Sequence, residues 1–142
     1  MRIVTIIAAL ILLGTGTIFA FTDNGDSTIT DSRTGLMWQK QDDGTVRTWE
    51  NAISYCEGLT LAAQSDWRLP NIKELKTIVD NTKYSPAIDM TYFPNTQSSS
   101  YWSSSTDAGY TDNAWCVSFD SGNVGNDGKA DTGYARCVRG GQ

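Results

Sequence analysis

The stretch Asp66-Trp67-Arg68-Leu69-Pro70-Asn71-Ile72-Lys73-Glu74-Leu75 carries the clearest structural signals in this sequence. Asn71 and Glu74 have the spacing of a capping box, in which each side chain accepts a hydrogen bond from the other residue's backbone. Apolar residues then recur at helical spacing, which predicts a helix over residues 72–79. Pro70 keeps the extended residues before it out of this helix. The centre of the chain therefore changes from extended to helical backbone at Pro70.

A second helix is predicted before this stretch. Thr48 is a suitable N-cap, and the apolar positions that follow it share one helical face. These positions are Trp49, Ala52, Ile53, Cys56 and Leu59. Cys56 is therefore expected to point into the core.

Short extended segments precede and follow the two helices. Strands are predicted at 21–23, 27–30 and 36–38, and again at 101–103, 114–119 and 134–139. The dipeptide Asn24-Gly25 suits the positive φ angles of a tight hairpin, and residues 120–123 form a later turn. Strands, two helices and further strands predict an α+β domain with a mainly antiparallel sheet.

The composition limits the chemistry of this chain. Its 142 residues suit one domain, with 16 acidic and 11 basic side chains, a net charge of -5 and no histidine. The lack of histidine excludes Ser-His-Asp and Cys-His catalysis and every histidine metal site. The acidic balance disfavours nucleic acid and anionic membranes as partners. We therefore expect a non-enzymatic domain.

Residues 1–20 have the pattern of an export signal. Arg2 is followed by an apolar run from Ile3 to Leu13, and Ala20 is the expected cleavage point. An uncleaved membrane anchor is the alternative, which the threonines and glycines after Leu13 disfavour. We thus expect a mature domain over residues 21–142, located in the periplasm, at the cell surface or outside the cell, without stable membrane insertion.

Two smaller patterns concern disulfides and metal ions. Cys56, Cys116 and Cys137 allow three pairings with one cysteine left over, and disulfides persist in exported proteins. A different group superficially resembles a calcium loop, namely Asp23, Asn24, Asp26 and Asp31. Its spacing lacks the glycine and distal glutamate of an EF-hand, so turn chemistry is the preferred interpretation and no cofactor is expected.

Four segments in order resemble the bacterial DUF1566 family, the domain at the C-terminus of a Legionella collagen-like adhesin. They are the hairpin region 24–26 with 34–38, the stretch 66–75, the run Tyr101-Trp102-Ser103-Ser104-Ser105 and the ending Arg136-Cys137-Val138-Arg139. That family is similar to C-type-lectin-like domains and to the formylglycine-generating-enzyme fold. The resemblance implies two helices packed on a twisted, mainly antiparallel sheet, with a loop-rich upper sheet exposed for binding.

The resemblance also carries expectations about cysteines, ligands and assembly. In such folds a disulfide joins the first helix to the last strand, which implies Cys56–Cys137 and leaves Cys116 as a buried, unreactive thiol. The related enzymes use a cysteine pair near the chain end, but the disulfide better explains Cys137. The adhesin relatives bind sulfated polysaccharides and form trimers. Net acidity makes a neutral glycan or a protein the better ligand here, and the missing collagen-like stem puts trimers in doubt.

The C-terminal part of the chain has the composition of a recognition surface, with tyrosines among small polar residues. Trp102, Trp115 and Phe119 are assigned to the core. The predicted ligand-binding residues are Tyr101, Cys116, Ser118, Asp120, Asn123, Asn126, Asp127, Asp131 and Tyr134. Glycans and cell-surface proteins are the expected partners, and a structural subunit of a surface assembly remains an alternative.

A second resemblance concerns the same region. Residues 113–115, Phe119, 122–124 and 136–140 resemble the variable C-terminus of proteins diversified by retroelements. Mutation at adenines cannot convert asparagine codons to Lys, Gln, Glu, Met or Trp, and between Ser98 and Ala135 only Trp102, Trp115 and Lys129 belong to these types. This resemblance adds Ser121, Gly125 and Thr132 to the ligand-facing set.

Overall fold

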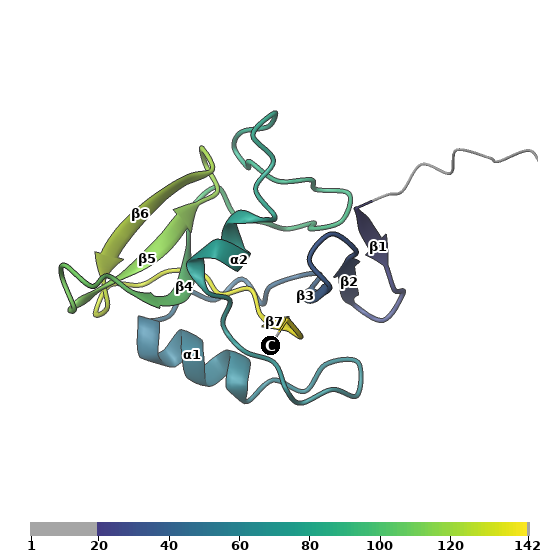
Figure 1. Ribbon diagram of the computed structural model, residues 1–142, viewed down its shortest axis with the longest axis horizontal. Coiled ribbons are helices and arrows are strands. Elements are labelled where there is room, and N and C mark those ends of the chain that lie inside the picture. Colours follow the sequence, from purple (N-terminus) through teal and green to yellow (C-terminus); the bar gives the residue numbers. More distant parts are fainter. Residues whose placement is uncertain (1–19, 142) are drawn as a thin grey trace, which may run out of the picture.

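The computed structural model describes residues 20–141, so most of the predicted export signal lies outside the described residues. The α+β class is confirmed, with two helices and two antiparallel sheets in the described part of the chain (Figure 1). The first sheet consists of β1 (Phe21–Asp23), β2 (Thr28–Asp31), β3 (Leu36–Gln39) and β7 (Val138–Arg139), in that spatial order. The second consists of β4 (Ser100–Thr106), β5 (Asn113–Ser118) and β6 (Asn123–Gly128). The helices are α1 (Trp49–Glu57) and α2 (Ile72–Lys76).

The β1–β2 hairpin forms as predicted, but its turn differs. The positive φ angles are 75° at Gly25 and 72° at Ser27, so the prediction of a tight Asn24-Gly25 turn is wrong. The longer loop is stabilised by side chains, since Asp23 accepts a hydrogen bond from the Gly25 backbone at 3.0 Å and Asp26 accepts one from Thr28 at 3.1 Å. The carboxylates of the superficial calcium loop thus hold the turn.

Strand β6 was not predicted from the sequence. Its residues, Asn-Val-Gly-Asn-Asp-Gly, include only one β-branched side chain, and Gly and Asn are unfavourable in strands. The segment is extended because each of its six residues pairs with β5, from Asn123 opposite Ser118 to Gly128 opposite Asn113. Tertiary pairing therefore overrides a weak local preference.

Both helices begin where the sequence predicts. The Asn71 side chain accepts a hydrogen bond from Glu74 N at 2.8 Å, and Glu74 accepts one from Asn71 N at 2.9 Å, which confirms the capping box. Helix α2 ends at Lys76, three residues earlier than predicted. The next residues make shorter-range bonds, with Ile78 N donating to Leu75 O, so they form a tightened turn.

Replacing Asn71 with alanine is expected to lower the free energy of unfolding by about 1 kcal/mol, because the N-terminal amides of α2 lose their acceptor. Thr48 offers a matched control, since it occupies the N-cap of α1 but makes no side-chain capping bond. Urea unfolding of both variants measures the difference. Equal losses for Asn71→Ala and Thr48→Ala would contradict this account of the cap.

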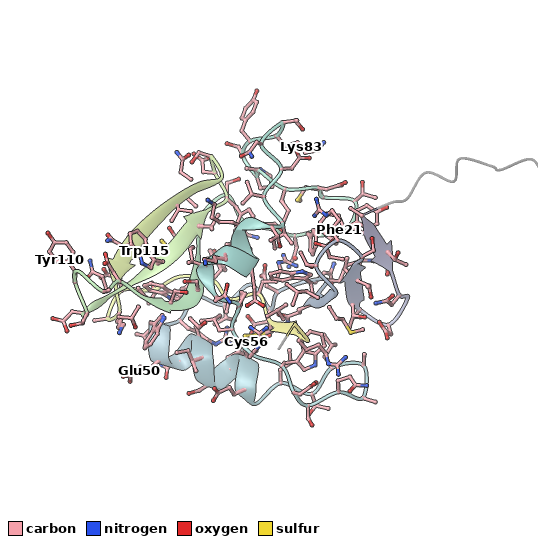
Figure 2. All side chains as sticks on the ribbon, in the orientation of Figure 1. Phe21, Glu50, Cys56, Lys83, Tyr110 and Trp115 are labelled. Atoms are coloured by element: carbon pink, nitrogen blue, oxygen red, sulfur yellow. A yellow bond between two sulfur atoms is a disulfide. The ribbon has the colours of Figure 1, made fainter. Side chains whose placement is uncertain are left out.

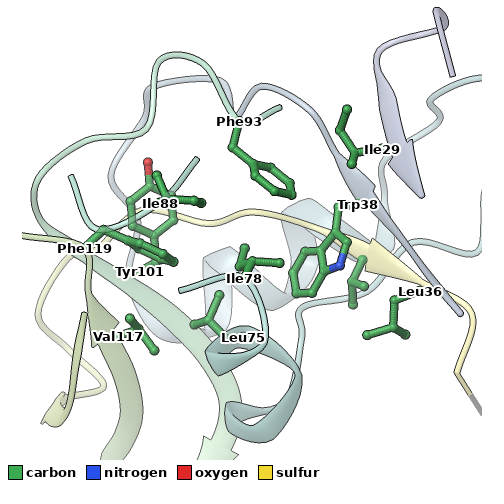
Figure 3. Packing of buried hydrophobic residues seen from close by; sticks show 11 residues of the cluster. Ile29, Leu36, Trp38, Leu75, Ile78, Ile88, Phe93, Tyr101, Val117 and Phe119 are labelled. Atoms are coloured by element: carbon green, nitrogen blue, oxygen red, sulfur yellow. The ribbon is translucent and has the colours of Figure 1, made fainter. Parts of the chain in front are cut away.

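The core consists of two apolar clusters. One joins the first sheet, α2 and the second sheet, and includes the fully buried Trp38, Tyr101 and Phe119 (Figure 3). The other lies between α1 and the second sheet and includes Trp67 and Trp102. The predicted core positions of Trp102 and Phe119 are confirmed. The prediction for Trp115 is wrong, because this side chain is only half-buried.

The C-terminal segment joins the two sheets. Tyr134 bridges to Tyr101 of β4 in parallel, whereas Val138 pairs with Trp38 of β3. The predicted strand over 134–139 is therefore divided between two sheets, and only its last two residues form β7. Between these contacts Cys137 bonds to Cys56 of α1, which confirms the disulfide that the family resemblance implied. Cys116 is free and buried, also as expected.

Candidate binding surface

The register of the second sheet determines which side chains share a face. Residues opposite one another in a strand pair point to the same side of the sheet. Ser100 is opposite Ser118, which is opposite Asn123, and Cys116 is opposite Gly125. Asp127 is opposite Ala114 on this same side. We define the polar face by five residues of the three strands, Ser100, Ser118, Asn123, Gly125 and Asp127.

Both sides of the sheet contact the core. Trp102, Ala114 and Cys116 lie on the side of the polar face but are buried in the cluster with α1, whereas the other side packs against α2. Tyr101 and Val117 point to that other side and pack with Leu75 of α2. On the polar face, Asn123 and Gly125 are exposed, and Ser100, Ser118 and Asp127 are half-buried. The polar face is thus the incompletely buried part of this side, with small uncharged groups and one carboxylate.

Several predicted ligand-binding residues lie on or beside this face. Ser118, Asn123 and Asp127 belong to it. Asp120 lies in the β5–β6 turn and accepts a hydrogen bond from Ser85 Oγ at 2.6 Å. Asp131 follows β6, where its backbone N–H donates to the Gly128 carbonyl at 2.8 Å. Two further residues of the retroelement set, Ser121 and Thr132, are exposed at the same two ends of the hairpin.

Three predicted ligand-binding residues point to the opposite side of the sheet. The prediction for Tyr101 is wrong, because its side chain is fully buried and its hydroxyl donates to Asp42 Oδ2 at 2.6 Å. Tyr134 is half-buried and its ring stacks on Tyr101 with centroids 5.3 Å apart. Asn126 is opposite Trp115, and its amide donates to the Asp107 carboxylate. Strand alternation separates these three side chains from the polar face.

Two residues at this surface were not singled out by the sequence. Ser100 was missed because the predicted strand begins one residue later, at Tyr101, and only the pairing with Ser118 places it on the polar face. The composition of this region does not distinguish Tyr110 from its other tyrosines, but the Tyr110 side chain is 71% exposed in the loop between β4 and β5 (Figure 2). It is the most projecting aromatic side chain of the second sheet's loops.

Cys116 lies beneath the polar face rather than on it. Its side chain is 3% exposed, and its Sγ lies 3.3 Å from Asp127 Oδ2. Burial and the neighbouring Asp127 carboxylate raise the pKa of the Cys116 thiol to about 12. The thiol is therefore protonated at neutral pH. A reactive pair with Cys137 is excluded because Cys137 is bonded to Cys56.

Cys116 is expected to resist modification in the folded protein. At pH 8 we expect a thiol reagent such as dithionitrobenzoate to label Cys116 at least about 100-fold more slowly than in denaturant, because both the raised pKa and burial suppress thiolate attack. Absorbance of the released thiolate measures this ratio. In denaturant one thiol should react, since the other two cysteines are bonded. Fast labelling of the native protein would contradict the buried, neutral state.

The second sheet and its loops carry unbalanced negative charge. Residues 98–134 contain five aspartates and a single base, Lys129. Ion pairs in the described part of the chain involve other carboxylates, so none of these five aspartates has a cationic partner there. The Lys129 ammonium lies 4.1 Å from the centre of the Trp49 ring. The surface thus offers hydrogen-bond acceptors and negative potential.

Hollows in the molecular surface lie beside the hairpin and around the loops. One of about 470 Å³ is lined by Glu50, Asp112 and Lys129 at the end of β6. Another of about 420 Å³ lies under the 82–91 loop, next to Tyr84, which is 81% exposed. Within residues 20–141, no group of three or more acidic, histidine or cysteine side chains is arranged to hold a metal ion.

Comparison with known proteins identifies the family. A model described as the Lcl C-terminal domain matches residues 27–139, which include both sheets' core strands, both helices and the polar face. The chain belongs to the Lcl C-terminal domain family. The resemblance to the C-terminal domain of the Legionella collagen-like adhesin is thereby confirmed, and the chain is an adhesin-related domain. No curated protein matches this Lcl C-terminal domain at a significant level.

Membership of the Lcl family indicates a surface or secreted location and binding to external partners. Among the residues that the structure describes, no helix is long and apolar enough to cross a membrane. The Lcl match begins after β1 and ends at Arg139, the last residue of β7, so the disulfide and the C-terminal segment both belong to the family domain.

Proposed function

We propose that this chain is an exported, non-enzymatic domain with a C-type-lectin-like arrangement, which binds a glycan or a cell-surface protein through the polar face. The observation that carries this proposal is the register of β5 and β6. It brings Ser118, Asn123 and Asp127, which are separated in sequence, onto one side of a hairpin. Small hydroxyl, amide and carboxylate groups are suited to hydrogen bonds with sugar hydroxyls or a peptide backbone.

Charge favours a neutral ligand over a sulfated one. A sulfated polysaccharide needs basic side chains that converge on one surface. Residues 98–134 instead provide five aspartates and one lysine, whose ammonium lies over the Trp49 ring. Asp127 would repel a sulfate group placed on the polar face. We therefore infer that this member of the family differs in ligand charge from relatives that bind sulfated polysaccharides.

A second candidate is a receptor diversified by a retroelement, which would use the same surface. The observation that favours it is that alternate positions of the predicted variable set, Cys116, Ser118, Asn123, Gly125 and Asp127, point to one side of the sheet. Changes at Ser118, Asn123, Gly125 and Asp127, which are exposed or half-buried, would alter the ligand while the buried core residues stay constant. Cys116 lies beneath them and does not reach the surface. A near-copy of the coding region for residues 98–139 beside the gene would support this candidate.

The test is a glycan array that presents neutral and sulfated sugars side by side, with and without a calcium chelator. We expect binding to neutral sugars that Asn123→Lys reduces at least about tenfold, because a long charged side chain obstructs the polar face. Asn51→Lys is the matched control, since Asn51 is an exposed asparagine on α1. Binding that Asn123→Lys leaves unchanged would refute the polar face as the site, and a silent array with folded protein would favour a protein ligand.

A further inference from the structure

Strand β6 is an open edge of the second sheet, whose strand order is β4-β5-β6 (Figure 1). Immediately beyond the last β5–β6 pair, Asn113 and Gly128, the Lys129 N–H donates to the Asp112 carbonyl at 2.8 Å, so Lys129 and Asp112 are a hydrogen-bonded pair. In an antiparallel ladder hydrogen-bonded and non-bonded pairs alternate. Asn123, Gly125 and Asp127 therefore direct their backbone groups toward β5, whereas Val124, Asn126 and Gly128 direct theirs away from the sheet.

These outward backbone groups have few partners. The Gly128 carbonyl accepts a hydrogen bond from Asp131 N. Among residues 20–141, nothing bonds to the backbone N–H or C=O of Val124 or Asn126. Proteins commonly protect such an edge with proline, lysine or a bulge. Between Asn123 and Gly128 there is no proline or lysine, and the pairing with β5 continues without a register shift.

The charge around this edge favours one kind of occupant. Asp127 is on the edge strand. The Asp131 carboxylate lies against the end of the same strand, since a Cβ added at Gly128 would be 3.0 Å from Asp131 Oδ2. Neither carboxylate has a cationic partner among the described residues. A second copy of this chain would present the same negative charge and be repelled. A strand with basic side chains would neutralise both carboxylates.

We propose that the β6 edge binds an extended basic segment of a partner protein as an added strand. The outward N–H and C=O groups of Val124 and Asn126 pair with the partner's backbone, and lysine or arginine side chains lie opposite Asp127 and beside Asp131. Backbone pairing supplies affinity in this mode, and alternate side chains supply specificity. The site goes beyond the proposed function, because it uses the main chain of the edge strand; of the polar face it shares only the Asp127 carboxylate.

Fluorescent peptides of about ten residues, the length of a long strand, test this proposal. An alternating lysine–threonine peptide is compared with a glutamate–threonine peptide and with a lysine–threonine peptide N-methylated at alternate residues. Anisotropy at low salt should show binding of the first at least about tenfold tighter than of either control. Equal binding of the N-methylated peptide would show a purely electrostatic contact and overturn strand addition.

Amide hydrogen exchange by NMR locates the added strand. In the free protein, Val124 and Asn126 amides should exchange rapidly and those of Gly125 and Asp127 slowly. The lysine–threonine peptide should slow Val124 and Asn126 at least about tenfold. Protection of these amides in the free protein, with dimers in sedimentation, would show that a second copy occupies the edge and would overturn the proposal.

Variants of the edge strand separate the contribution of backbone pairing to peptide binding from the contribution of charge. Val124→Pro removes an outward N–H that β5 does not use, so the ladder should persist while peptide binding falls at least about tenfold. Asp127→Asn should weaken binding and its salt dependence, whereas Glu57→Gln on α1 should change neither. Unchanged binding by folded Val124→Pro would overturn strand addition. Asn123→Lys, which obstructs the polar face, tests the proposed function separately because it leaves the edge N–H groups in place.

Discussion

Replacing Arg136 with methionine is expected to lower the free energy of unfolding by about 3–5 kcal/mol, the usual cost of removing one partner of a buried ion pair. Arg136 is fully buried, and its guanidinium donates to the carbonyl of Gln39 at 2.8 Å, to Thr96 at 2.9 Å and to Asp42 at 3.2 Å. Methionine fills much of the same space but donates no hydrogen bond. The variant therefore leaves a buried carboxylate without its cation.

The network around Asp42 explains why the loss is large. Asp42 accepts hydrogen bonds from Arg136 and from the Tyr101 hydroxyl, and its other oxygen accepts the Gly44 N–H at 2.8 Å. Burial and the Asp42 carboxylate raise the pKa of Tyr101, so this hydroxyl remains a donor at neutral pH. Burial lowers the pKa of Arg136, while Tyr101 and Asp42 act in the opposite direction. Removing Arg136, Asp42 or Tyr101 therefore leaves a buried polar group of the others without its hydrogen-bond partner.

Arg139→Met is the matched control for this prediction. Arg139 lies three residues further on and pairs with Asp66 at 2.6 Å, but that carboxylate is 62% exposed. Water screens such a pair, so we expect a much smaller change in urea unfolding. The double variant Arg136→Met/Asp42→Asn should recover part of the loss by removing the orphaned charge. Similar stabilities of Arg136→Met and Arg139→Met would refute the importance of the buried network.

The second large effect is expected from the disulfide. Cys56→Ala should lower the free energy of unfolding by about 4 kcal/mol on the chain-entropy model, because the bond closes a loop across 81 residues of sequence separation. Both sulfur atoms belong to fully buried residues of the cluster between α1 and the second sheet. In the unfolded chain the cross-link keeps residues 56 and 137 together, which lowers the conformational entropy of that state.

Thermal unfolding under oxidising and reducing conditions measures this contribution. Reductant should bring the melting temperature of the native protein down to about that of Cys56→Ala and leave the variant unchanged. Cys116→Ala serves as a control, since Cys116 is also buried but forms no disulfide. A melting temperature that Cys56→Ala does not lower would show that the closed loop contributes little to stability.

Both helices could be predicted from the sequence because each has a local signal, either a capping motif or a helical spacing of apolar residues. The capping box at Asn71 and Glu74 placed the start of α2, and the apolar spacing from Trp49 placed α1. The disulfide followed only from the family resemblance, because three cysteines by themselves allow three pairings. Strand β6 has no local signal and depends on β5 as a template. The tail's aromatic residues were assigned by composition, which cannot distinguish an exposed Tyr110 from a buried Tyr101.

Capping and apolar spacing act over a few positions, so they were enough to predict the class of the domain and the start of both helices. Composition indicated the region proposed for binding. Which side chains share a face follows from the pairing of the strands, which no local pattern specifies. A register between β5 and β6 directs Asn123 outward and Asn126 to the opposite side. Tertiary structure also decided that Arg136 is buried, since its acceptors come from Gln39, Asp42 and Thr96, far away in the chain. Such contacts form only when the C-terminal segment joins both sheets.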